Sequence, residues 1–263
     1  MPTPFSYRAV LFDLDGTLYR GAEPIPGAIE TVEELIDRGV LVRYVTNNAT
    51  LTREAFAAKL RGMGFPALAN EVYSSATGTA TYLAESGIRS TFVVGMPGLV
   101  STLRSADIEV VNAGEDGVVQ PNGERAEAVV VGLCRTLSYE LLDGAMNAIR
   151  SGGRFVATNP DATFPLEGGR FSPGAGSIVA AVRTCSGVEP FVVGKPKPFL
   201  IETILRDADL RPYEALVVGD RIDTDIAAGR DAGCPTYLVL SGVETVLPPD
   251  QKGAADVRGL LGL

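Results

Sequence analysis

The sequence predicts an α/β fold built on a doubly wound parallel sheet, with a second, smaller α/β domain inserted into it. Short apolar segments typical of buried strands alternate along the 263 residues with segments of helical character, and this order is typical of a parallel sheet covered by helices. The alternation changes between residues 80 and 178, where Gly- and Asn-rich turns separate further strands and helices. We therefore expect a core of residues 1–79 and 179–263, and an inserted domain of residues 80–178.

The first part of the core is expected to contain two strands, Val10–Phe12 and Val40–Val45, whose consecutive apolar residues are typical of burial on both faces. One helical segment follows the first strand and two follow the second, and each ends at a glycine, because glycine adopts the left-handed conformation of a helix end at little cost. The expected helices span Ala28–Arg38, Thr52–Arg61 and SSATGTATYLAESG, and they end at Gly39, Gly62 and Gly87.

The inserted stretch has elements of its own. Strands are expected at TFVVG, AEAVVVGL and RFVATN, and a helix over Tyr139–Arg150. Turn-rich segments such as NAGEDGVVQPNGE separate them. Because this stretch is self-sufficient as an α/β unit, an inserted domain is the simplest layout. The helix GAGSIVAAVRTCSG and the strands ALVVGD and TYLVL then return to the core pattern.

The composition excludes several classes of function. A net charge of −9 without a cluster of Lys or Arg argues against a nucleic-acid or anionic-membrane partner. The sequence has no histidine, which removes Ser-His-Asp and Cys-His nucleophiles and His-ligated zinc. The sequence has no CxxC pair among Cys134, Cys185 and Cys234, and its N-terminus shows no secretory signal. We therefore expect three free thiols in a cytoplasmic protein. Chemistry must rest on carboxylates, Lys, hydroxyls and amides, with a hard metal ion as an option.

Polar residues follow four of the expected strands, and ligands of open α/β sheets bind beyond the carboxyl ends of the strands. Acids follow Val10–Phe12 and ALVVG, hydroxyl and amide residues follow Val40–Val45, and a lysine follows PFVVG. We therefore expect these strand ends to form one site. Its residues are Asp13 and Asp15, Thr46, Asn47 and Asn48, Lys195, and Asp220.

Asp13 and Asp15 are expected to point to the same side, since residues i and i+2 of an extended chain share a face. Gly16 then allows the backbone to turn sharply. The alternative is a polar turn whose carboxylates are satisfied by backbone N–H groups. Asp220 at the end of another strand favours a functional pair of acids over a turn.

Converging carboxylates without a histidine favour a hard cation that prefers oxygen ligands, and Mg²⁺ fits best. We expect Asp220 to be a direct ligand and Asp225 to orient the metal-bound waters. Asp223 lies between them in the sequence and has a simpler explanation as a helix cap. Mg²⁺ commonly accompanies phosphate, so the expected chemistry is phosphoryl transfer.

The two acids after the first strand suit the two chemical roles of such a reaction. Asp13 is the candidate nucleophile, which would form an aspartyl-phosphate. Asp15 is the candidate acid and base: it would protonate the leaving oxygen and then accept a proton from the hydrolytic water.

The remaining candidates would hold the phosphoryl group. Thr46 and Asn47, with Asn48 beside them, can bind phosphoryl oxygens, and Lys195 can neutralise the charge shared by the phosphate and the nucleophile. The alternatives are a helix-capping turn at residues 46–48 and a solvated lysine at position 195. The adjacent prolines of VVGKPKP favour a rigidly held lysine.

The inserted domain is expected to select the substrate without performing the chemistry, because all the reactive strand ends lie outside it. The loop NPDATFP follows the strand RFVAT, and its polar residues Asn159 and Asp161 are the candidates to contact a leaving group. The alternative is that Asn-Pro-Asp is only a turn.

The candidate residues lie in four segments: DLDGT (Asp13–Thr17), VTNN (Val45–Asn48), GKPKP (Gly194–Pro198) and GDRIDTD (Gly219–Asp225). In this order the segments resemble the four motifs of haloacid dehalogenase superfamily phosphatases. A closer resemblance, to the NagD-like, 4-nitrophenylphosphatase branch, is carried by YRG, TNNA, NPDATFP and GAGSIVAA. This branch includes phosphatases of glycerol phosphates, pyridoxal phosphate and other small phosphate esters.

This resemblance implies a Rossmann-like core with an α/β cap inserted between the second and third motifs. It also implies Mg²⁺ held by Asp13, the backbone carbonyl of Asp15 and Asp220, and a small phosphate monoester (of sugar, glycerol, nucleotide or pyridoxal type) as substrate. The cap differs among family members, so the resemblance does not identify that ester. We expect no nucleic-acid or membrane partner, and we consider a homodimer formed through the cap.

Two other functions use similar residues. A haloacid dehalogenase-type hydrolase would keep Asp13 as the nucleophile but needs no acid at Asp15. A response-regulator receiver also carries an Asp, acidic metal ligands, a Thr and a Lys on a doubly wound sheet, but it is only about 120 residues long and has no inserted domain. Asp15 and the chain length therefore favour the phosphatase.

Overall fold

A computed structural model gives the structure of residues 5–123, 125–165 and 170–263. The chain divides into two compact units. The first comprises Met1–Thr46, Glu54–Tyr73 and Lys195–Leu263, and the second comprises Asn47–Arg53 and Ser74–Gly194. The chain therefore leaves the first unit and returns to it twice.

The first unit alternates strands with helices, and the alternation follows the predicted pattern. Its elements, in chain order, are β1 (Ala9–Asp13), β2 (Tyr19–Arg20), β3 (Glu23–Pro24), α1 (Ala28–Asp37), β4 (Leu41–Thr46), α2 (Arg53–Gly62), β5 (Val72–Ser74), α7 (Phe199–Asp207), β13 (Ala215–Gly219), α8 (Ala227–Asp231), β14 (Thr236–Val239) and β15 (Gly253–Ala254).

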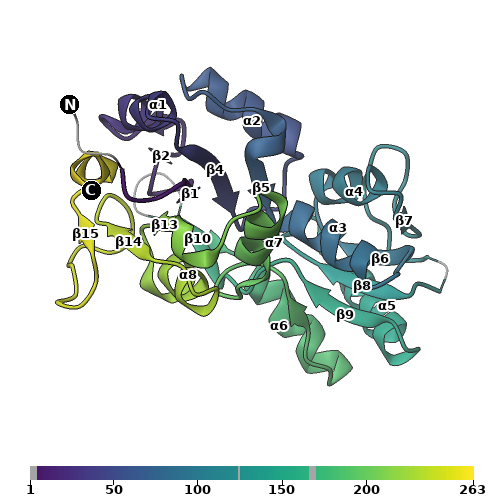
Figure 1. The fold of residues 1–263 in the computed structure, drawn as a ribbon. Helices are drawn as coiled ribbons and strands as arrows, with labels where there is room; N and C mark the ends of the chain where they lie inside the picture. Colours follow the sequence, from purple (N-terminus) through teal and green to yellow (C-terminus); the bar gives the residue numbers. More distant parts are fainter. Residues whose placement is uncertain (1–4, 124, 166–169) are drawn as a thin grey trace. The chain divides into compact units, whose positions relative to one another are not determined.

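The main sheet of this unit has the strand order β15-β14-β13-β1-β4-β5. β1 pairs in parallel with β13 and with β4, and β13 pairs in parallel with β14. Figure 1 shows α1 and α2 on one face of these strands and α7 and α8 on the other. β4 and β5 lie on one side of β1, and β13, β14 and β15 lie on the other, each set in chain order. The predicted doubly wound α/β core is therefore confirmed.

Burial on both faces explains the apolar runs of the central strands. Successive side chains of a strand point to opposite faces, and Ala9 and Leu11 pack with α7 residues such as Leu200 and Ile204 in one cluster. Val10 and Phe12, which point to the other face, are also fully buried. No polar residue interrupts β1 until Asp13, its last residue.

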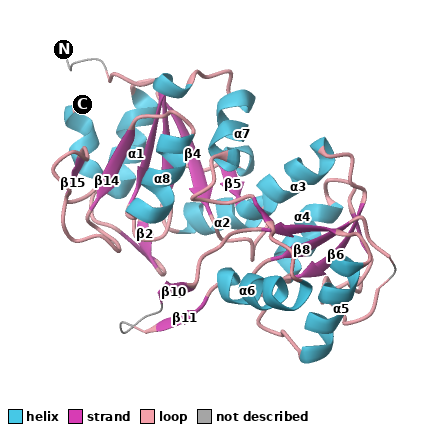
Figure 2. Ribbon diagram, turned by 90° about the horizontal axis from the view of Figure 1, so that it is seen from below, coloured by secondary structure: helices cyan, strands magenta, loops and turns pink. Residues whose placement is uncertain are grey.

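The second unit carries its own parallel sheet, with the strand order β12-β9-β8-β6-β7. α5 and α6 pack against each other and against β8, and β10 and β11 form a separate antiparallel pair (Figure 2). Its elements are α3 (Ser75–Glu85), β6 (Ser90–Val94), α4 (Pro97–Arg104), β7 (Glu109–Val110), β8 (Ala128–Val131), α5 (Tyr139–Arg150), β9 (Arg154–Ala157), β10 (Thr163–Pro165), β11 (Phe171–Pro173), α6 (Ala175–Ser186) and β12 (Phe191–Val192).

The boundaries of the units differ from the expected inserted domain of residues 80–178. The expected limits cut through α3 and α6, whereas both helices belong whole to the second unit. The strand PFVVG was also expected to end in the core sheet, and this was wrong: β12 pairs with β9 in the second sheet. A short apolar run shows that a segment is a buried strand, but it does not show which sheet the strand joins.

Within the described ranges, no helix is both long and apolar enough to cross a membrane. Cys134, Cys185 and Cys234 are free thiols, as expected. Burial raises the pKa of the Cys234 thiol to about 11, so this thiol stays protonated at neutral pH and is a poor nucleophile.

Candidate active site

Three neighbouring strands of the first unit end at one edge of its sheet. Asp13 is the last residue of β1 and pairs with Val45 of β4, so Thr46 follows on the adjacent strand. On the other side of β1, β13 ends at Gly219, directly before Asp220. Because all three strands are parallel, their carboxyl ends coincide, and Asp13, Thr46 and Asp220 come to the same edge.

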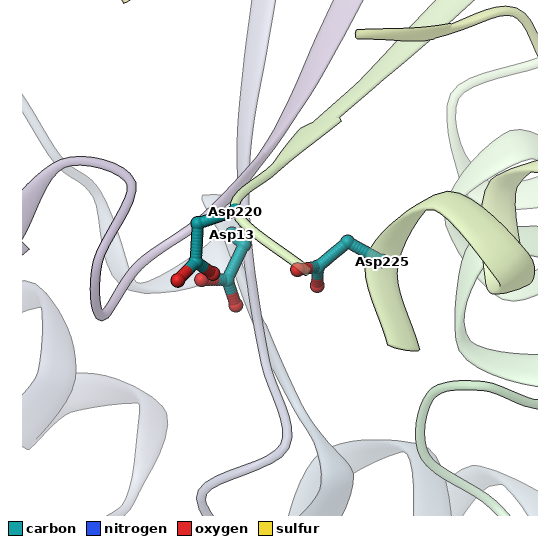
Figure 3. Close-up of side chains that lie close together, drawn as sticks. All are labelled: Asp13, Asp220 and Asp225. Atoms are coloured by element: carbon teal, nitrogen blue, oxygen red, sulfur yellow. The ribbon is translucent and has the colours of Figure 1, made fainter. Parts of the chain in front are cut away.

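Asp13, Asp220 and Asp225 form a cluster in which one carboxylate oxygen of each lies within 4.8 Å of the others. Figure 3 shows the carboxylates of Asp13 and Asp220 side by side, with Asp225 directed toward them from the helical segment that follows β13. Asp220 and Asp225 are each only 2% exposed. Backbone N–H groups hold them: Val243 donates to Oδ2 of Asp220 at 2.7 Å, and Arg221 donates to Oδ2 of Asp225 at 3.1 Å.

Two glycines let the backbone approach Asp220 closely. A Cβ atom at Gly16, whose φ is +87°, or at Gly242 would overlap the Asp220 carboxylate. The Ser241 hydroxyl donates to the Gly16 carbonyl at 2.8 Å. The segment 241–243 therefore encloses the acid, a role that the sequence analysis missed. The small pair Ser-Gly directly after the strand TYLVL was the signal that could have identified it.

Lys195 links two of the acids. Its Nζ atom lies 2.6 Å from Oδ1 of Asp13 and 2.6 Å from Oδ1 of Asp225, and the residue is 3% exposed. The alternative of a solvated lysine therefore does not hold. Asp223 lies apart from the cluster, since it is exposed and pairs with Arg221 at 2.9 Å. Asp225 contacts the lysine and the backbone, so it anchors Lys195 beside Asp13.

The cluster carries more negative than positive charge, with three carboxylates around one ammonium. Burial, with repulsion by Asp225, raises the pKa of Asp220 to about 7. Burial also raises the pKa of Asp13 well above its usual range, against the opposing effect of Lys195. Burial disfavours the ammonium form of Lys195, but Asp13 and Asp225 outweigh this and raise its pKa. An oxygen-only donor set with surplus negative charge fits a hard divalent cation.

Asp15 lies just past the cluster, at the turn that leads into the β2–β3 hairpin, and its side chain is exposed. The residue as a whole is exposed, but its carboxyl group is partly desolvated, which raises the pKa of this group; the Lys59 charge and the Gly21 N–H oppose the shift. Lys59 Nζ also lies 4.1 Å from the ring centroid of the buried Tyr19. An accessible carboxyl group that keeps its proton more readily than usual is suited to proton transfer.

The other predicted site residues lie in the second unit. Asp161 accepts hydrogen bonds from Nδ2 of Asn47 at 3.1 and 3.2 Å, and Nδ2 of Asn159 donates to the Asn47 carbonyl at 2.7 Å. Asn48 is exposed, and its Oδ1 accepts from the N–H and hydroxyl of Thr50. The two residues predicted to contact a leaving group therefore both contact Asn47.

Comparisons with known proteins agree with this geometry. A family model of haloacid dehalogenase-like hydrolases matches residues 10–109, and a second model of HAD-like hydrolases matches residues 192–257. The acid sugar phosphatase of Staphylococcus aureus strain MRSA252 is 39% identical over 241 residues, which cover 91% of this chain and 89% of that protein. The chain belongs to the haloacid dehalogenase-like hydrolases.

Solved structures of these hydrolases share the whole fold. The p-nitrophenyl phosphatase from Archaeoglobus fulgidus is 33% identical and covers 97% of this chain and 98% of its own, with a TM-score of 0.87. The glycerol phosphate phosphatase from Mycobacterium tuberculosis, solved in complex with magnesium, is 36% identical and covers 97% of this chain and 77% of its own, with a TM-score of 0.84.

These relatives confirm the family that the four motifs predicted and the predicted class of enzyme, a phosphoric monoester hydrolase. They favour this class over the dehalogenase and receiver alternatives, since the named relatives are phosphatases.

Proposed function

We propose that this hydrolase is a Mg²⁺-dependent phosphatase of small-molecule phosphate monoesters and that it acts through an aspartyl-phosphate on Asp13. The observation that carries the proposal is the buried cluster in which Lys195 bridges Asp13 and Asp225 beside Asp220. Phosphoryl transfer requires a positioned nucleophile and neutralisation of the phosphate charge. A lysine held against Asp13 supplies part of that neutralisation, and the neighbouring carboxylates are suited to bind a hard cation that supplies the rest.

The chemistry of the cluster supports a magnesium site. Mg²⁺ prefers oxygen ligands and commonly binds through one or two carboxylates together with phosphate. Asp13, Asp220 and the backbone carbonyl of Asp15 would hold the ion. Asp225 would not be a direct ligand and would orient the metal-bound waters. When bound, the ion supplies positive charge that offsets the carboxylates and the phosphate. The magnesium complex of the glycerol phosphate phosphatase supports this choice of ion.

The protein's own groups would perform the covalent steps. Lys195 holds Oδ1 of Asp13, which orients the carboxylate so that an oxygen attacks phosphorus. A bond from Asp13 to phosphorus forms while the bond to the ester oxygen breaks, and Asp15 gives that oxygen its proton. Asp15 then accepts a proton from water, which attacks phosphorus and releases inorganic phosphate and the free Asp13 carboxylate.

The remaining residues would bind the phosphoryl group and select the ester. Thr46, at the end of β4, and Lys195 would hold the phosphoryl oxygens, with Asn47 and Asn48 directly after Thr46. The second unit would act as the cap that determines the leaving group. The relatives named above act on sugar phosphates, glycerol phosphate and p-nitrophenyl phosphate, which supports small esters as the substrate class. A homodimer through this unit stays a prediction.

The test is a screen of the purified protein against 4-nitrophenyl phosphate and a panel of phosphorylated sugars, glycerol phosphates, nucleotides and pyridoxal phosphate. We expect hydrolysis with Mg²⁺ and loss of activity with excess chelator. Asp223→Ala serves as the matched control for Asp220→Ala, because Asp223 lies apart from the cluster. Full activity in chelator, or equal effects of the two variants, would contradict the proposal.

A further inference from the structure

Two side chains of the second unit converge on the peptide carbonyl of Asn47. The Ser75 hydroxyl donates to this oxygen at 2.5 Å, and Nδ2 of Asn159 donates to it at 2.7 Å. Ser75 and Asn159 are 0% and 5% exposed. Two buried donors on one carbonyl hold its direction firmly, because turning the carbonyl away would break both hydrogen bonds.

Asp161 holds the side chain of the same residue. Both of its carboxylate oxygens accept from Nδ2 of Asn47, at 3.1 and 3.2 Å. Asp161 is fixed in turn, since its N–H donates to Oδ1 of Asn159 at 3.2 Å. Backbone and side chain of Asn47 are therefore both held by the turn Asn159–Asp161.

The beginning of α6 locks that turn in place. The N–H of Gly176 donates to the Asp161 carbonyl at 2.8 Å, and the N–H of Gly174 donates to the Ala162 carbonyl at 2.8 Å. A Cβ atom at Gly174 or Gly176 would overlap the carbonyls of Asp161 and Pro160, respectively. The segments TNNA, NPDATFP and GAGSIVAA, far apart in the sequence, thus form one hydrogen-bonded group.

Holding the Asn47 carbonyl also restrains the backbone N–H of Asn48, because the two groups belong to the same peptide bond. A trans peptide is planar, so its C=O and the N–H of the next residue point in opposite directions. Fixing the Asn47 carbonyl therefore fixes the direction of the Asn48 N–H. It also fixes the position of Asn47, the residue bonded directly to Thr46.

We propose that Asp161 and Asn159 are positioning residues, which act by holding Asn47 and the peptide after it in the conformation that phosphoryl binding needs. The proposal rests on the proposed function, and it gives these residues a different role from the leaving-group contact that the sequence suggested. A contact to the leaving group would change the preference among esters. A positioning role changes the reaction of every ester alike, because all of them share the phosphoryl group.

The first experiment compares kcat and KM of Asp161→Ala, Asp161→Asn and Asp116→Ala on 4-nitrophenyl phosphate and on the best sugar phosphate. Asp116 is the matched control: it is exposed, lies in the same unit and accepts a backbone hydrogen bond from Val118. We expect Asp161→Ala to lower kcat about 10- to 100-fold, by the same factor for both esters. Asp161→Asn keeps an acceptor for Asn47 and should retain most of the activity. Asp116→Ala should match the unaltered protein.

The second experiment is a double-mutant cycle with Asn47→Ala, which detects whether two residues act through one another. If Asp161 acts through Asn47, then Asp161→Ala should cause no further loss of kcat in the Asn47→Ala background. Melting temperatures of all variants show whether they are folded.

The outcomes separate the two proposals. A loss that differs more than about tenfold between the two esters, or full additivity in the cycle, would overturn the positioning role and leave the phosphatase intact. Unchanged activity of Asp161→Ala would overturn it as well. An unaltered protein that hydrolyses no ester with Mg²⁺ would overturn the proposed function and the positioning role with it.

Discussion

Replacing Asp220 by Asn should affect stability and activity in opposite directions. The change removes one of the carboxylates that crowd the buried cluster but keeps the shape of the side chain and an acceptor for the Val243 N–H. The metal-free protein should become more stable, because less like charge is buried. Mg²⁺ binding and hydrolysis should be lost, because the ion loses a carboxylate ligand.

The size of the effect follows from the pKa of Asp220, which is raised from 3.8 to about 7. The folded, metal-free protein therefore binds this proton more tightly than the unfolded chain does, and the stability contributed by Asp220 falls as the pH rises from about 4 to about 7. Each pH unit corresponds to about 1.4 kcal/mol. Above pH 7, ionised Asp220 costs about 4 kcal/mol, of which we expect Asp220→Asn to recover about 2–4 kcal/mol.

Urea unfolding in chelator at pH 5 and pH 8 measures the free energies of unfolding of the variant and of the unaltered protein. The stability gain of Asp220→Asn should be about two to three times larger at pH 8 than at pH 5, where only part of the penalty has developed. Saturating Mg²⁺ should stabilise the unaltered protein, by about 2.7 kcal/mol at 100 times the dissociation constant, and should not stabilise the variant. A variant that is less stable than the unaltered protein at pH 8 in chelator would refute the reasoning.

Three further predictions concern single residues of the site. Asp13→Asn should fold but show no turnover, and hydrolysis of an ester made chiral at phosphorus should retain configuration in the unaltered protein, because attack by Asp13 and then by water inverts phosphorus twice; net inversion would exclude the aspartyl-phosphate. Asp15→Asn should slow hydrolysis of sugar phosphates about 10²–10⁴-fold but affect 4-nitrophenyl phosphate much less, since 4-nitrophenol leaves without a proton; equal losses would remove the acid–base role. Gly242→Ala places a Cβ against the Asp220 carboxylate, so calorimetry should show weaker Mg²⁺ binding, and unchanged affinity would mean that segment 241–243 does not position the ligand.

The sequence alone was sufficient for the fold class and for placing Asp13 and Asp220 at one edge of the sheet. Apolar runs of a few residues, glycines at helix ends and the alternation of strands with helices are local properties, and they are decided within a few residues of each position. Asp13 and Asp220 could be assigned to one site because parallel strands end at the same edge of a sheet, whatever their order in the chain. The absence of histidine then limited the chemistry to carboxylates, a lysine and a hard ion.

The tertiary structure decided which partners these residues have. Lys195 follows a strand of the second sheet, yet its Nζ pairs with Asp13, 182 residues away, and with Asp225. Asp161 holds Asn47 from 114 residues away. Such pairs depend on which sheet a strand joins and how a helix packs on a turn, and these choices are made by long-range burial and hydrogen bonding. Local sequence patterns do not specify such long-range pairs. The sequence therefore identified the chemical groups, and the fold determined how they are held.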